Sequence, residues 1–155
     1  MSDVKTPTRP AAAYEADFFA WTQDQAEKLR ARGHNELDWE NVAEEIESLG
    51  RSDKTAIGSN LCVVLEHLIK WRYQPDRRND SWSDSINEHR DRIARIVEDS
   101  PSLGGLPANV LSVEYQRGRR KVLRSSGFSE SQISTVCPFA IGQVLDPDFW
   151  PEPDA

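Results

Sequence analysis

The middle of the chain contains an apolar segment that restricts the fold more than any other feature. Apolar side chains recur every three or four residues from Ile57 to Leu68, and Leu61–Leu65 is an unbroken apolar run. The spacing predicts a helix, and the unbroken run indicates that this helix is buried on more than one side. Ser52 or Asp53 can cap its start, and Pro75 ends it because proline cannot continue a helix. We therefore expect a central helix over residues 52–74.

Four further segments have the same helical period, and no segment shows the alternation of a half-buried strand. Each is bounded by residues that favour helix starts or ends, such as aspartate before the first turn or glycine after the last. The sequence thus predicts helices over residues 17–32, 38–49, 80–99 and 107–126, three of which end at Gly33, Gly50 and Gly127.

These elements predict an all-α, single-domain helical bundle of about five main helices. The third helix lies at its centre, and the C-terminal segment CPFAIGQVLDPDFWPEP wraps the outside. We expect a loosely ordered tail over residues 1–13, one all-α domain over residues 14–151 and a short tail over residues 152–155.

The pattern of apolar residues and cysteines predicts a cytoplasmic protein. No apolar run approaches the roughly 20 residues that cross a bilayer, and the first residues contain no apolar signal core. Cys62 and Cys137 form neither a disulfide framework nor a metal-binding CxxC pair, so we expect reduced thiols. We therefore predict no membrane partner.

Several short sequences occur in an order that resembles one protein family. They are YEADFFAW, ENVAEEIESLG, HLIKWRYQP, SWSDSINEHR, SPSL and CPFAIGQVLDPDFWP, and they span about residues 14–151. The ordered set resembles the bacterial family named domain of unknown function 29. This resemblance implies an all-α bacterial domain with no established activity and no catalytic residue to carry over. Members commonly have glutamine at the position of His89, which argues against a mechanism that depends on this histidine.

Carboxylates line one flank of the predicted helix over residues 38–49. Glu44 and Glu47 are three residues apart and share a helix face. Helical bundles hold metal pairs with such carboxylates and with histidines that follow a glutamate by three residues. Because neither His67 nor His89 follows a glutamate at that spacing, a solvated or salt-bridged face is favoured and we predict no metal site. A metal-binding bundle or hydrolase-like enzyme that uses Glu44, Glu47 and His67 is the main alternative.

The third and fourth predicted helices carry polar and aromatic side chains beside their apolar faces. His67 is expected to be a partly buried imidazole with one hydrogen-bond acceptor, or alternatively a ligand or acid–base group at the edge of a groove. His89 is expected to be a neutral member of the core. Together with the helix over residues 38–49, the third and fourth predicted helices form a candidate binding groove. Its candidate residues are Glu44, Glu47, His67, Trp71, Arg72, Gln74, Arg78, Trp82, His89 and Arg90.

Basic side chains gather between residues 70 and 124, whereas both ends of the chain are acidic. On the predicted fifth helix, four cations share one outer side and form a candidate basic patch of Arg117, Arg120, Lys121 and Arg124. Such a patch can hold phosphates, so nucleic-acid binding through the basic residues 70–124 is a second alternative. The net charge of −7 disfavours it.

No catalytic residue or cofactor motif follows from the sequence. The glycine-rich phosphate-binding patterns GxxxxGK and GxGxxG are both missing. We therefore favour a small binding or regulatory module over an enzyme. It would act on a protein or small-molecule partner through the predicted groove and would use no cofactor.

Overall fold

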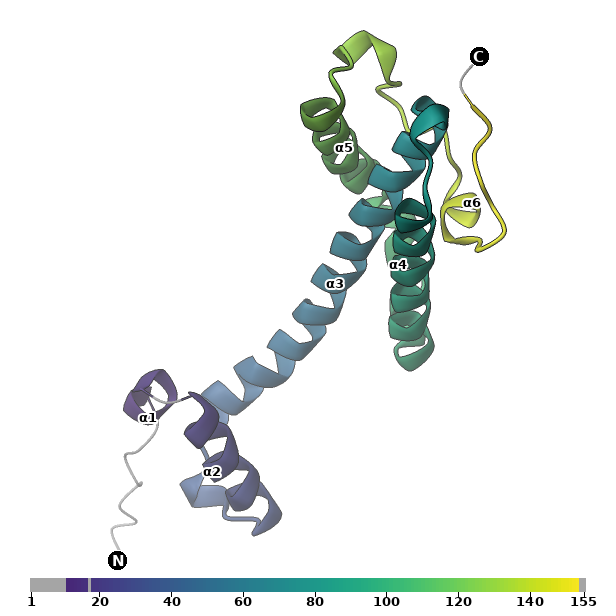
Figure 1. The fold of residues 1–155 in the computed structure, drawn as a ribbon. Coiled ribbons are helices and arrows are strands. Elements are labelled where there is room, and N and C mark those ends of the chain that lie inside the picture. The colour runs from purple at the N-terminus through teal and green to yellow at the C-terminus, as the bar shows by residue number, and fades with distance from the viewer. Residues whose placement is uncertain (1–10, 17, 154–155) are drawn as a thin grey trace, which may run out of the picture. The chain divides into compact units, whose positions relative to one another are not determined.

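The computed structural model describes residues 11–16 and 18–153, and along them the chain is helical and contains no strand. The helices are α1 (Ala11–Ala16), α2 (Phe18–Arg30), α3 (Trp39–Tyr73), α4 (Asp80–Asp99), α5 (Leu106–Ser126) and α6 (Ile141–Leu145) (Figure 1). A short 3₁₀ turn precedes each helix from α3 to α6. The predicted all-α bundle is confirmed.

The chain divides into two compact units, Met1–Arg51 and Ser52–Ala155. Residues 1–10 and 154–155 of the two predicted tails lie outside the described residues, whereas residues 11–13 belong to α1. Within the described residues, no helix is both long enough and apolar enough to cross a membrane.

The predicted end of a helix at Gly50 is wrong, because the helices expected over residues 38–49 and 52–74 are one continuous helix, α3. A glycine ends a helix by adopting a positive φ, as Gly127 does after α5 with a φ of 75°. Gly50 keeps the helical conformation. In a helix interior glycine costs only about 1 kcal/mol relative to alanine, so good helix formers on both sides carry α3 through it.

In the first unit, the start of α3 is fixed by Asp38. Its carboxylate accepts a hydrogen bond from the Asn41 amide at 3.3 Å, as the sequence predicts for a helix cap. The Asp38 amide in turn donates to Oε1 of the buried Gln25 at 2.9 Å. Farther along α3, Ile46 and Leu49 are 64% and 69% exposed, so this part of the expected apolar stripe faces solvent in the structure.

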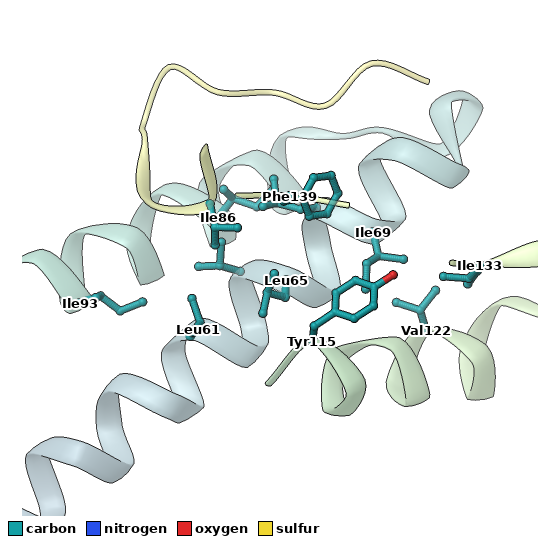
Figure 2. Close-up of a cluster of buried hydrophobic side chains, with 12 residues drawn as sticks. Leu61, Leu65, Ile69, Ile86, Ile93, Tyr115, Val122, Ile133 and Phe139 are labelled. Carbon is teal, nitrogen blue, oxygen red and sulfur yellow. The ribbon is translucent and has the colours of Figure 1, made fainter. Parts of the chain in front are cut away.

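The hydrophobic core lies in the second unit, and α3 is its central helix as predicted. Five of its twelve buried side chains come from α3 between Leu61 and Ile69. In Figure 2, side chains of α3, α4 and α5 point toward one another. The other seven buried side chains of the core are Ile86, Ile93, Tyr115, Val122, Ile133, Phe139 and Val144. Because Ile133, Phe139 and Val144 follow α5 in the chain, the turn after α5 and the C-terminal segment complete the core.

Two glycines allow α3 and α5 to approach closely. A Cβ atom on Gly118 would lie 3.0 Å from the amide nitrogen of Glu66 and 3.3 Å from the carbonyl oxygen of Cys62. A Cβ atom on Gly58 would lie 3.1 Å from Oε1 of Glu114. The first contact is with backbone atoms, which cannot swing aside, so the approach of the two helices depends on the absence of a side chain at Gly118.

Candidate ligand-binding groove

The aromatic part of the predicted groove is covered by the chain's own C-terminal segment. The ring of Trp71 lies 4.7 Å from the ring of Trp150, measured between centroids. Arg78 stacks over Trp71 at 4.9 Å, donates from Nε to the Trp71 carbonyl at 2.8 Å, and reaches the Pro151 carbonyl at 3.4 Å. Trp71 and Arg78 therefore hold the C-terminal segment against the end of α3.

Arg90 anchors the same segment from α4. Arg90 is only 4% exposed, and its guanidinium donates to the carbonyls of Val144 at 2.7 Å and Phe149 at 3.0 Å. Burial lowers the pKa of Arg90 to about 10, and Trp150 stacks over the charge at 5.6 Å. Because Arg90 is occupied by backbone carbonyls, its role is to hold the fold together.

The remaining groove candidates on this side also contact their own neighbours. Arg72 lies over the ring of Tyr73 at 5.8 Å and lines a hollow of about 400 Å³ under the C-terminal segment. The Lys70 ammonium lies over the ring of Trp82, 5.9 Å from the ring centroid. Gln74 follows the last residue of α3, and its backbone N–H donates to the Lys70 carbonyl at 2.8 Å. Each of these three residues is therefore engaged by a neighbour in its own chain.

Both central histidines are half-buried and bond to their own helices. Nδ1 of His67 lies 2.8 Å from the Val63 carbonyl, and Nδ1 of His89 lies 2.7 Å from the Ser85 carbonyl. Because a carbonyl only accepts, each Nδ1 carries the proton and each Nε2 is the acceptor in the neutral ring. Burial lowers the pKa of His67, which keeps the ring neutral at pH 7. The acceptor of His67 is thus a backbone carbonyl of its own helix.

The two candidate glutamates lie in the first unit, whereas His67 lies in the second. Glu44 and Glu47 are exposed, and both form ion pairs with Arg51. Oε2 of Glu47 lies 3.7 Å from Nη1 of Arg51. This is the salt-bridged face that their spacing favours. In the part of the chain that the structure describes, no three His, Cys, Asp or Glu side chains lie close enough to hold a metal ion.

The four cations of the predicted basic patch line one groove in the second unit. The groove lies between α3 and α5, has a volume of about 380 Å³, and is bordered on the α5 side by Arg117, Arg120, Lys121 and Arg124. Arg117 pairs with Glu114 at 2.9 Å. Among the described residues, the other three cations have no carboxylate within ion-pairing distance. We call this feature the basic groove.

The α3 wall of the basic groove is small and mostly apolar. It consists of Ser59, Cys62 and Val63. Cys62 is buried, and burial raises the pKa of its thiol, so it is protonated at neutral pH. The wall therefore offers an apolar surface opposite a row of cations.

One acidic side chain, Glu114, lies among these cations and is not one of the predicted site residues. The Glu114 side chain is 6% exposed, and its Oε1 accepts from Nη1 of Arg117 at 2.9 Å. Its Oε2 is buried and has no hydrogen-bond partner in the structure. A signal existed in the sequence, because Glu114 lies one turn before Gly118 on the buried side of the helix, where a charged residue is unexpected.

The fold and the groove together define an all-α protein that carries a cationic groove between its central helix and α5. The chain matches the family model described as "Domain of unknown function DUF29" over residues 13–150. It therefore belongs to the domain of unknown function 29 family, as the ordered short sequences predict. No curated protein and no solved structure shows significant similarity to it.

Proposed function

We propose that the protein is a binding module that holds a phosphate-bearing ligand in the basic groove. The observation that carries this proposal is the row of cations on α5, three of which have no acidic partner among the described residues. Cations three and four residues apart on a helix repel each other, at a cost of about 0.2–0.5 kcal/mol per pair. A bound anion offsets this repulsion and converts the row into a set of charge-assisted hydrogen-bond donors.

The size of the groove and the charge of the whole chain favour a small ligand. A volume of about 380 Å³ falls in the range of small-molecule sites, which is roughly 300–1,000 Å³. The net charge of −7 repels a long polyanion outside the groove. A short anion that fits inside the groove meets the cations without approaching the acidic surface.

The proposal includes a regulatory role in a bacterial cytoplasm. Both cysteines are free thiols, which supports a reducing compartment. The absence of a recognisable catalytic group at the groove supports binding over catalysis, because the cysteine at its wall is a buried, protonated thiol.

Titration calorimetry with inorganic tripolyphosphate at low salt tests the proposal. We expect saturable binding with one site, which weakens as the salt concentration rises. Changing the three unpaired cations to glutamine should reduce the affinity at least tenfold, by roughly 1.4 kcal/mol. The variant is Arg120→Gln, Lys121→Gln and Arg124→Gln.

A matched control removes the same charge elsewhere in the second unit, at Arg77, Arg92 and Arg95, all of which are exposed. Equal losses in the two triple variants would show that tripolyphosphate responds only to net charge and would exclude the basic groove. Short single-stranded RNA and DNA, titrated in parallel, distinguish a nucleic acid from a small phosphate-bearing ligand. Tighter binding of the polymers, with a steep salt dependence, would favour nucleic acid over a small ligand.

A further inference from the structure

The first unit presents a row of large apolar side chains to solvent on one side of α3. Trp39, Ile46 and Leu49 are 56%, 64% and 69% exposed. They lie seven and three residues apart, so they share one side of the helix over about 15 Å of its axis, at 1.5 Å per residue. We call this row the exposed stripe. Single exposed apolar residues are common on protein surfaces, whereas a row of them on one face is typical of an interaction site.

Trp39 is held in position although more than half of it is exposed. Its Nε1 donates to the His34 carbonyl at 3.0 Å, and its ring stacks on the His34 imidazole with the centroids 5.9 Å apart and the ring planes 9° apart. Tryptophan is enriched among the residues that dominate the binding energy of protein interfaces, and a side chain that is already fixed loses little entropy when a partner covers it. Trp39 is therefore suited to anchor a partner.

Two small residues lie on the same side of α3 as the exposed stripe. Ala43 and Gly50 are both exposed. Beyond its own stretch of helix, no atom lies within 4 Å of a Cβ atom added to Gly50, so packing inside the chain does not require a glycine there. Glycine destabilises a helix interior and is favoured where another backbone approaches closely. The small residues leave a low surface between the large ones, which another helix can approach.

The charges beside the exposed stripe define the chemistry of the partner. Residues 39–50 contain four glutamates and no lysine or arginine. Glu40, Glu44 and Glu47 are exposed and lie on one flank of the stripe, where Arg51 forms ion pairs with the last two. A second copy packed antiparallel would bring two such acidic flanks together, and an anionic lipid surface would be repelled in the same way. A helix that carries cations beside its own apolar stripe meets the flank with opposite charge.

We propose that the exposed stripe is a docking site for a basic amphipathic helix of a partner protein. The partner helix packs its apolar side chains on Trp39, Ile46 and Leu49, and its lysines or arginines lie beside the row of glutamates. Docking there uses none of the residues that line the basic groove, all of which lie in the second unit. The two binding activities can therefore be tested independently.

Fluorescence anisotropy of a labelled synthetic peptide, titrated with the full chain, tests the docking site. The probe has about 18 residues, or five helical turns, with leucine at every third or fourth position and lysine on both flanks. We expect it to bind saturably at physiological salt. A second peptide, with glutamate in place of every lysine, should bind at least tenfold more weakly because its charges repel the acidic flank.

A double variant removes apolar surface from the exposed stripe without removing a buried contact. Ile46→Gln with Leu49→Gln should bind the lysine peptide at least tenfold more weakly than the unaltered protein. The matched control is Val113→Gln with Val136→Gln, which changes two side chains of the second unit that are 54% and 74% exposed. The control should bind the peptide with unchanged affinity, and equal losses in the two double variants would overturn the proposed site.

Gly50→Gln tests the close approach without weakening the protein. Glutamine is a better helix former than glycine, so the variant should unfold at a higher temperature, yet the added side chain should weaken binding of the lysine peptide at least threefold. An unchanged affinity would contradict the close approach of a partner helix at this position.

Sedimentation velocity of the unaltered protein, without peptide, distinguishes a partner helix from a second copy. We expect a monomer. A dimer that Ile46→Gln with Leu49→Gln converts to a monomer would assign the exposed stripe to self-association and overturn the basic partner. A lysine peptide that does not bind the full chain would overturn it as well.

Discussion

At the scale of single residues, His67 links burial to the pH dependence of stability. Its pKa is lowered from the ordinary value of 6.5, first by burial and further by the Lys70 ammonium. As the pH falls below about 6.5, the unfolded chain therefore takes up a proton before the folded protein does, and the free energy of unfolding decreases. We expect His67→Gln to lose less stability than the unaltered protein between pH 7.5 and pH 5, as measured by urea unfolding.

The exposed His34 provides the control for this prediction. His34→Gln makes the same substitution at an exposed position, so it reveals any effect on acid stability that comes from exchanging histidine for glutamine and not from burial. An equal acid sensitivity of His67→Gln and the unaltered protein would contradict the assigned role of burial. His67 is half-buried and does not line the basic groove.

The residues that the sequence predicts well are those whose neighbours lie on the same helix. The row from Arg117 to Arg124 follows from helical spacing alone, and the structure places all four cations on one groove. Arg90 could not be interpreted in the same way. Its partners are backbone carbonyls more than 50 residues away. Such long-range contacts leave no local pattern in the sequence.

At the scale of helices, glycine acts in opposite ways at two positions. At Gly118 an added Cβ atom would meet backbone atoms of α3 at 3.0 Å, so we expect Gly118→Ala to lower the free energy of unfolding by about 1–3 kcal/mol. At Gly50 no atom lies within 4 Å of an added Cβ atom, so Gly50→Ala should stabilise α3 by about 0.5–1 kcal/mol. Circular dichroism at 222 nm during thermal unfolding measures both effects.

The two variants control for each other, because they make the same substitution in the interior of a helix. If Gly50→Ala destabilised the protein, Gly50 would be the helix end that its sequence context suggests, and α3 would not be continuous. The comparison also shows why helix ends are only partly predictable. Pro75 lacks a backbone donor and follows the end of α3, whereas a glycine ends a helix only where the following chain turns away.

At the scale of the whole molecule, the second unit contains the whole core cluster and the whole basic groove. All twelve side chains of the core cluster lie between Leu61 and Val144, and the basic groove is built from residues 59–124. A chain cut before Ser52 begins with a serine followed by an aspartate, which can cap the shortened α3. The fragment 52–155 therefore keeps its core, its C-terminal segment and its groove.

We expect this fragment to be helical, to unfold cooperatively and to melt within about 5 °C of the second unit in the full chain. It should also bind tripolyphosphate with the affinity of the full chain, because no groove residue is removed. Calorimetric scanning and titration measure the two properties on one sample. A fragment with helical dichroism but no cooperative transition would show that residues 1–51 are needed to fix the core, and a single-domain organisation would then describe the molecule better than two units.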